Sequence, residues 1–197
     1  GGRRLIKNIK VKFESDPESP EFEFENKIVG GSIPKEYIPA VEDGIRKYCE
    51  DGGELRLPIV GVKAQLVDGK SHDVDSSELA FRAAGRLAIK GAMEQGGTTI
   101  LEPLMKVEVQ VPDEFVGAVI GDLNSRRMQI EELTQGPGDI RIVRGKVPIA
   151  ETFQYSTTLR SLTQGRATFS MEPNEYMPVP RSLQDVIVAE QKERRKK

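Results

Sequence analysis

Hydrophobic and polar positions in the first half of the chain follow two different periods. Apolar residues that alternate with charged ones, as in Phe22-Glu23-Phe24-Glu25, predict strands with one buried face. Apolar residues spaced three or four positions apart predict amphipathic helices. We therefore expect a mixed unit of strands and helices that ends at a pair of glycines. The predicted elements are strand 5–13, strand 22–25, helix 34–52, strand 58–67 and helix 79–93, with Gly96-Gly97 as the stop.

The second half repeats these signals in a different order. A turn signal, Gly136-Pro137-Gly138, separates two of its strands, and Pro112 opens its first helix. The predicted order is β-α-β-β-α-β, which is the ferredoxin-like arrangement. The fold class is therefore α+β in two domains, with a boundary near residues 97–101. The predicted elements are strand 104–111, helix 112–123, strands 128–133 and 140–147, helix 149–162 and strand 167–171.

Composition supports two small soluble domains. Apolar residues make up 37% of the 197 residues and charged residues 30%, a balance that fits two small cores better than one large core. The net charge of −2 gives no general argument for nucleic-acid binding, so such a case depends on local patches. The single cysteine, Cys49, excludes an internal disulfide, and we expect it to be packed. No apolar run is long enough to span a membrane, and we expect a cytoplasmic protein. Because the chain starts Gly1-Gly2 without methionine, we expect a piece of something larger.

A polar turn between the strand 58–67 and the helix 79–93 contains the only histidine, His72. The carboxylates of Asp73 and Asp75 beside it invite a metal or acid–base interpretation, but a lone histidine without a cysteine pair is a weak signal for either. An ordinary surface histidine is the simpler interpretation. Asp75 and Glu78 have the form of a capping box for the following helix. The phosphate-binding pattern G-x-x-x-x-G-K-[ST] does not occur in the sequence, so we expect no nucleotide site, no catalytic residues and no cofactor in this chain.

Two clusters of hydrogen-bond donors end the helices of the second domain. The first cluster is Asn124, Ser125, Arg126 and Arg127, and the second is Arg160, Ser161, Gln164 and Arg166. Both suit RNA phosphates as well as an ordinary solvated face, and the residues alone leave the two interpretations even. Since both helices of a ferredoxin-like fold cover one face of the sheet, we expect a single polar surface. A short helix over residues 181–197 ends in basic residues that complement the helix dipole or contact RNA phosphate.

Several segments in order resemble the C-terminal part of bacterial elongation factor G. The resemblance covers most of residues 22–175. The segments are FEF at 22–24, KIVGGSIPKEYIPAV at 27–41, HDVDSSELAF at 72–81, LEPLMKVEV at 101–109, VIGDLNSRR at 119–127 and LRSLTQGR at 159–166.

The resemblance implies a domain assignment. Residues 1–98 are similar to the fourth domain of the factor, with a fold like domain 2 of ribosomal protein S5. Residues 99–180 are similar to the ferredoxin-like fifth domain, and residues 181–197 form a C-terminal helix and basic tail. The GTPase domains of such a parent, with their GTP and magnesium, are outside this chain.

A role on the ribosome follows from the same resemblance. The family uses the fourth-domain tip in the decoding centre, where it holds the tRNA–mRNA module during translocation. Here that tip consists of Gly69, Lys70, Ser71, His72 and Asp73. The fifth domain of the family touches large-subunit RNA, which would engage the two donor clusters. Expected partners are the ribosome, tRNA–mRNA and the parent's own GTPase domains, with no membrane.

Some positions depart from the family pattern. Ser71 stands where the tip usually has tyrosine, Met128 where glycine is common, and Gln154 where Glu-Met-Phe-Gly-Tyr has its glycine. These changes suggest a divergent paralogue. A paralogue for ribosome recycling, a ribosome-protection factor and a stand-alone RNA-binding module remain alternatives, and a phosphate-binding loop upstream in the parent would exclude the last.

Overall fold

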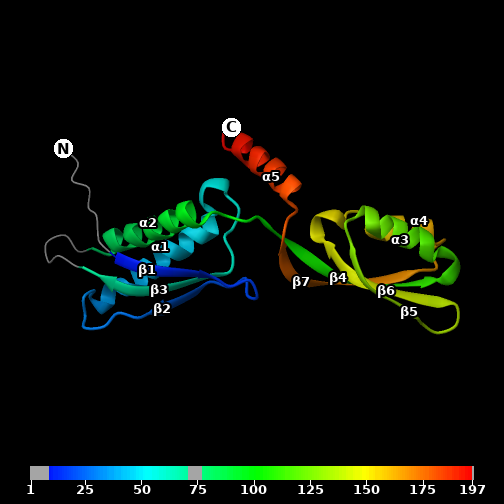
Figure 1. The fold of residues 1–197 in the computed structure, drawn as a ribbon, viewed down its shortest axis with the longest axis horizontal. Coiled ribbons are helices and arrows are strands. Elements are labelled where there is room, and N and C mark those ends of the chain that lie inside the picture. The colour runs from blue at the N-terminus through cyan, green and yellow to red at the C-terminus, as the bar shows by residue number, and fades with distance from the viewer. Residues whose placement is uncertain (1–8, 71–76, 197) are drawn as a thin grey trace. The chain divides into compact units, whose positions relative to one another are not determined.

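The computed structural model describes residues 9–70 and 77–196 of the chain. They form two compact units, one built from the part up to Thr99 together with the part from Pro180 onward, and the other from Ile100–Val179 (Figure 1). Each unit has its own sheet and its own hydrophobic core. The expected α+β class with two sheet-containing domains is confirmed.

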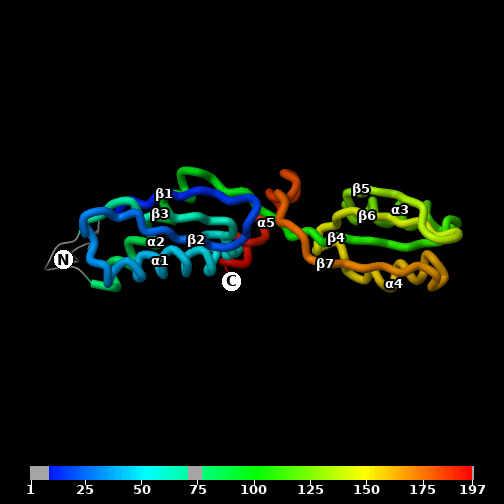
Figure 2. Tube along the Cα trace, turned by 90° about the horizontal axis from the view of Figure 1, so that it is seen from below, coloured from blue at the N-terminus to red at the C-terminus, as the bar shows by residue number. Residues whose placement is uncertain are grey.

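The first unit has a three-stranded sheet with two long helices on one face (Figure 2). Its order is β1-β3-β2, with β1 antiparallel and β2 parallel to the central strand. A parallel neighbour requires a long crossover, and α1 provides it between β2 and β3. The elements are β1 (Ile9–Ser15), β2 (Glu23–Asn26), a 3-10 turn (Lys35–Tyr37), α1 (Ile38–Asp51), a second 3-10 turn (Gly53–Leu55), β3 (Val62–Gly69) and α2 (Glu78–Gly96).

The core of the first unit lies between the sheet and the helices. Ala64 and Leu66 of β3 are fully buried, as the period of two requires, and they face Val41 and Ile45 of α1 in the same cluster. Cys49 is also buried there, and burial raises the pKa of its thiol to about 11. The expectation of a packed cysteine is therefore confirmed.

The N-cap of α2 differs from the expected one. Ser77 is the cap, and its Oγ accepts a hydrogen bond from the Ala80 N–H at 3.1 Å. The expected box of Asp75 and Glu78 is wrong: Glu78 is the first residue of the helix, where its carboxylate pairs with Arg82 at 2.7 Å, and Asp75 lies outside the described residues. Three candidate caps stand in a row in the sequence, and the backbone turns helical only after the last of them.

The second unit confirms the ferredoxin-like order β-α-β-β-α-β. Its four strands are all antiparallel and follow the order β5-β6-β4-β7. Figure 1 shows both of its helices over one face of the sheet. The elements are β4 (Leu101–Pro112), a 3-10 turn (Asp113–Phe115), α3 (Val116–Ser125), β5 (Gln129–Gln135), β6 (Ile140–Pro148), a 3-10 turn (Ile149–Glu151), α4 (Tyr155–Leu162) and β7 (Thr168–Pro178).

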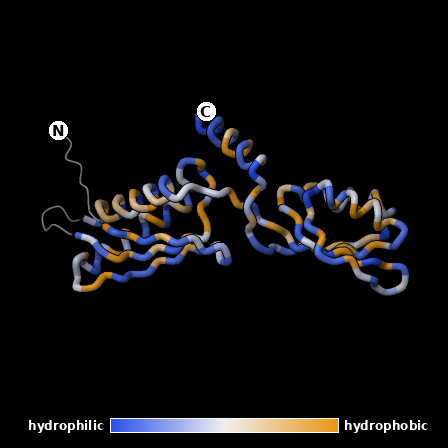
Figure 3. Tube along the Cα trace, viewed as in Figure 1, coloured by the Kyte–Doolittle hydropathy of each residue, from blue (hydrophilic) through white to orange (hydrophobic). Residues whose placement is uncertain are grey.

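Alternation along the strands builds the second core. Val107, Val109 and Val143 turn to the helices, and they pack in one cluster with Leu123 and Leu159. Figure 3 shows hydrophobic and hydrophilic positions interleaved along the strands of both units. Two expectations need correction here: residues 149–162 are not one helix, and the last strand extends well beyond residue 171.

The chain ends in α5 (Arg181–Arg194), which has no buried residue. Sequence patterns set residues 181–197 apart as a tail. In the structure α5 belongs to the first unit and approaches the turn Gly53–Leu55.

Candidate functional site

Gly69 and Lys70 lie where β3 leads into the expected tip. Gly69 pairs with Ile9 of β1, and its N–H donates to Oδ1 of Asp68 at 2.8 Å. Lys70 is exposed, so its ammonium group is accessible to a partner. The other expected tip residues, Ser71, His72 and Asp73, lie outside the described residues.

A second connection lies at the same end of the first unit. Residues 27–34 follow β2, and because β2 is parallel to β3 they emerge where β3 finishes (Figure 1). Ile33 anchors the connection in the core with 1% exposure, whereas Val29 is 89% exposed. Gly30 and Gly31 both adopt left-handed backbone, at φ 79° and 71°. The parallel pairing of β2 with β3 places this glycine pair near the end of β3.

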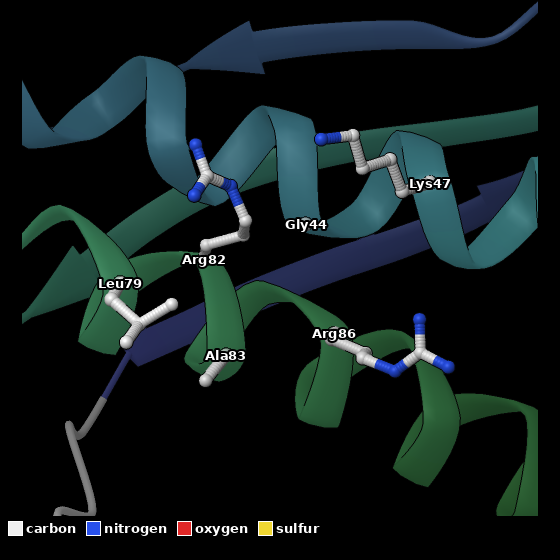
Figure 4. A pocket seen from close by; sticks show the side chains of 6 residues that line it. All are labelled: Gly44, Lys47, Leu79, Arg82, Ala83 and Arg86. Atoms are coloured by element: carbon white, nitrogen blue, oxygen red, sulfur yellow. The ribbon is translucent and has the colours of Figure 1, made fainter.

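The solvent side of the seam between α1 and α2 holds a shallow pocket of about 230 Å³. Its cationic rim is neutralised: Asp43 pairs with both Lys47 and Arg82, at 3.1 and 2.6 Å, and Asp51 pairs with Arg86 at 3.2 Å. Hydrogen bonds from Lys47 and then Arg82 hold the pKa of Asp43 below its usual value. The pocket is therefore a poor site for an anion. Figure 4 shows its lining residues, which are Gly44, Lys47, Leu79, Arg82, Ala83 and Arg86.

In the second unit, Arg126 at the end of α3 is a structural clamp. Its Nε donates to Asp122 at 3.0 Å, and its Nη1 donates to the carbonyl oxygens of Glu151 and Phe153 at 2.7 and 2.9 Å. The Nη2 group reaches the Thr158 hydroxyl at 3.2 Å. Every guanidinium nitrogen therefore has an internal acceptor, which leaves Asn124 and Ser125 as the exposed residues of the first donor cluster.

Arg127 is equally engaged inside the unit. It makes a two-pronged pair with the Glu102 carboxylate, at 2.8 and 2.9 Å, and its Nε donates to Glu151 at 3.2 Å. Hydrogen bonds to these two carboxylates raise the pKa of the Arg127 guanidinium. Such a pair holds the end of α3 against β4.

The second donor cluster is more open. Arg160, Ser161 and Gln164 are exposed, and Arg160 has no side-chain partner within the described part of the chain. Buried Thr163 fixes the turn beneath them: its hydroxyl donates to Leu159 O at 2.7 Å and accepts from the Ala167 N–H at 3.3 Å. The cluster therefore presents free donors from a rigid turn.

Arg166 is the last residue of the second donor cluster, and its ion pairs show where that cluster lies in the unit. Its guanidinium pairs with Glu114, directly before α3, and with Asp139 in the β5–β6 turn at 3.5 Å. The end of α4 therefore meets the start of α3, whereas Arg126 joins the end of α3 to the start of α4. The expectation of a single polar surface is wrong, because antiparallel helices place the two donor clusters at opposite ends of the unit.

The sheet face away from the helices carries a balanced ladder of charges. Arg144 pairs with Glu108 and Glu132 at 2.7 and 2.9 Å, and Lys146 pairs with Glu175 at 2.6 Å. Hydrogen bonds from Arg144 and then Gln110 lower the pKa of Glu108. Lys106 on the same face is exposed and has no acidic partner among the described residues, so most but not all of the cations on this face are neutralised.

The described residues offer neither a metal site nor a membrane span. Among residues 9–70 and 77–196, no three His, Cys, Asp or Glu side chains gather so that they could hold a metal ion. None of the helices described is both long and apolar enough to cross a membrane.

Comparison with known proteins assigns the family. Residues 1–97 match the model of elongation factor G domain IV, and residues 99–187 match that of the elongation factor G C-terminus. The chain belongs to the elongation factor G family. A protein of Thermus thermophilus with a known crystal structure is 35% identical, with a TM-score of 0.85. The similarity covers 95% of the present chain and 30% of that protein, so the chain spans less than a third of its length.

Two departures from the elongation factor G pattern have structural consequences. Gln154, where the usual motif has glycine, adopts left-handed backbone at φ 54°, which is strained for a residue with a Cβ. Met128 is 7% exposed and packs near Gly145, where a Cβ would lie 2.1 Å from the Gln129 carbonyl oxygen and 2.8 Å from the Met128 methyl group. The first departure retains strain, and the second adds a buried side chain to the core of the second unit.

Proposed function

We propose that this chain is the C-terminal, ribosome-binding part of a translational GTPase that promotes movement of tRNA and mRNA through the ribosome. The observation that carries the proposal is the match of the family's domain IV and C-terminus, in order, over residues 1–97 and 99–187. GTP hydrolysis would belong to domains of a longer parent. The function of the present chain would be contact with RNA.

In this proposal the end of the first unit is the tRNA-handling surface. Lys70 and residues 27–34 emerge beside each other there, because β2 and β3 run parallel. Contacts with ribose and phosphate suit RNA recognition by shape. The turn that contains His72 would complete this surface.

The second unit would contact ribosomal RNA through Arg160, Ser161 and Gln164. These groups are exposed, and Arg160 is free to meet a phosphate. Arg126 and Arg127 have a different role in this proposal: they hold the unit together.

The test is His72→Ala in the full-length parent, with single-turnover translocation and GTP turnover measured in parallel. We expect slower movement of tRNA at nearly unchanged GTP turnover. Lys90→Ala is the matched control, since Lys90 is an exposed cation further along α2. Unchanged translocation kinetics in the His72 variant would refute the assignment.

A further inference from the structure

The last turn of α5 and the residues after it carry a concentration of positive charge. Residues 188–197 hold five basic and two acidic side chains, in a chain whose net charge is −2. The match to the elongation factor G C-terminus ends at residue 187, so this basic end lies beyond the matched residues. Its described cations, all of which are exposed, are Lys192, Arg194, Arg195 and Lys196.

These four cations are free of acidic partners. Within residues 9–70 and 77–196, no ion pair or hydrogen bond joins any of their side chains to a carboxylate. Cations elsewhere in the chain behave differently: Arg127 and Arg144 each pair with two carboxylates. The positive charge at the end of α5 is therefore available to a partner.

Helical geometry gathers three of the cations on one side. Lys192, Arg195 and Lys196 are spaced at i, i+3 and i+4, so they share a face of the helix. The backbone stays helical through this stretch: the Arg195 N–H donates to Gln191 O at 3.2 Å, and the Lys196 N–H donates to Glu193 O at 3.1 Å. A row that is ordered before binding loses less conformational entropy when a partner arrives.

The opposite side of α5 faces the first unit. Leu183, Ile187 and Gln191 recur every four residues and are half-buried, whereas Lys192 and Lys196 are exposed. The helix therefore uses its less polar face for contacts within its own unit. The cationic row is left on the solvent side.

Composition decides between the classes of partner. Residues 181–197 contain no aromatic side chain, which is the usual anchor of a protein interface. A helix that lies on a membrane directs its large apolar side chains into the lipid, but Leu183 and Ile187 are on the half-buried face. Free cations without an apolar anchor suit an RNA backbone, where phosphate contacts release counterions.

We infer that the row of Lys192, Arg195 and Lys196 binds the phosphate backbone of ribosomal RNA. This inference rests on the proposed function, which brings the chain to the ribosome. The contact adds to any made by the residues that match the family, because the row lies beyond them. Phosphate contacts carry no sequence information directly, so the row strengthens binding without selecting a base.

The first experiment measures the affinity of the full-length parent for purified ribosomes over a salt series. Each phosphate contact contributes about 0.7–0.9 to the slope of log affinity against log salt. Lys192→Gln with Lys196→Gln should therefore reduce this slope by about 1.5 and weaken binding at low salt by about tenfold. Lys90→Gln with Lys106→Gln is the charge-matched control, since both lysines are exposed and unpaired in the described part of the chain. An equal fall of the slope in the control would overturn the inference.

Thermal unfolding of the same proteins separates binding from a purely structural role. Cations that only complement the helix dipole would leave the salt slope unchanged and lower the unfolding temperature of the double variant, and that result overturns the inference. Lys192→Arg with Lys196→Arg keeps both charges and should bind within about twofold of the parent.

The second experiment places a photo-reactive benzophenone side chain at position 195 and irradiates the purified complex. A cross-link to ribosomal RNA supports the inference. A cross-link only to ribosomal proteins, or only to other domains of the same protein, overturns it. An unchanged salt slope in the glutamine variant overturns this inference alone, whereas failure of the unaltered parent to bind ribosomes overturns the proposed function as well.

Discussion

Gly44 of α1 and Gly85 of α2 each lie directly against the backbone of the other helix. A Cβ at Gly44 would lie 2.0 Å from the Arg82 carbonyl oxygen, and a Cβ at Gly85 would lie 2.4 Å from that of Val41. Neither oxygen is at the end of a flexible side chain, so neither can move aside without moving a helix. The close packing of α1 on α2 therefore depends on both glycines.

Gly85→Ala and Gly44→Ala should each destabilise the first unit. Overpacking of this kind costs roughly 1–3 kcal/mol, and contact with backbone favours the upper part of that range. Chemical denaturation would measure the free energy of unfolding. Gly91→Ala is the control: it is in the same helix with open space around it, and it should gain up to about 1 kcal/mol from helix propensity. Equal effects at positions 85 and 91 would contradict the packing argument.

Gln154→Gly should stabilise the second unit. Left-handed backbone costs a non-glycine residue about 1–2 kcal/mol, and the extra freedom of glycine in the unfolded chain offsets part of this gain. A net gain of roughly 0.5–1 kcal/mol in unfolding free energy is expected. Gln154→Ala retains the Cβ and should change little. A loss of stability in the glycine variant would mean that the amide side chain has a structural role.

Tyr155 has a buried hydroxyl with no hydrogen-bond partner among the described residues. Burial, and then the charge of Asp122, raises the pKa of this phenol. Tyr155→Phe should be neutral or stabilising by about 1 kcal/mol, because an unpaired buried hydroxyl is costly. The comparison is Tyr155→Ala, which should cost about 3–5 kcal/mol in unfolding free energy through loss of the ring.

Tyr155→Phe also tests how the stability of the second unit depends on pH. In the folded state the raised pKa keeps the phenol neutral, whereas the unfolded chain ionises it near its ordinary value of 10.0. The stability that comes from keeping the phenol neutral in the folded state is therefore fully present below pH 10, and it is lost as the pH rises above that value. Tyr155→Phe should decline less than the parent over that range. A destabilised phenylalanine variant would instead indicate a hydrogen-bond partner such as a buried water.

Substitution of Arg126 should lower the stability of the second unit, whereas substitution of Arg160 should weaken ribosome binding. Arg126→Lys keeps the charge but loses the fork that joins α3 to the turn before α4, and a cost of about 2–3 kcal/mol in unfolding free energy is expected. Arg160→Ala removes an exposed, unpaired cation and should change stability by less than about 0.5 kcal/mol. Its effect should be weaker ribosome binding with a smaller salt dependence. Thermal unfolding and a salt series of binding measurements would show whether the two effects divide this way.

The order of elements was readable from the sequence because its signals are local. Alternation on β3 and β4 and the glycine stops predicted both units in the correct order. The expected helix over 149–162 was wrong, because periodicity does not report the left-handed turn at Gln154. The N-cap of α2 was misplaced for a similar reason: Asp75, Ser76 and Ser77 are all suitable caps, and only the backbone selects among them.

The candidate site was less predictable because it depends on long-range pairing. Arg126 and Arg127 read as free donors in the sequence, since their acceptors at Glu102, Glu151 and Thr158 are 24 to 32 positions away. The connection 27–34 comes to lie near the end of β3 only through the parallel pairing of β2 with β3. Sequence patterns identified the donor-rich segments, but the partners of each side chain came from the tertiary structure.

The antiparallel course of α3 and α4 makes the second unit bipolar. The first donor cluster lies at one pole and the second at the other, with the valine core between them. Two binding contacts at opposite ends of one rigid body can form one after the other, so the first contact raises the effective concentration of the second. Free-energy changes of variants at the two poles should then add, since they share no partner. The unit would then hold its two binding contacts at a fixed distance from each other.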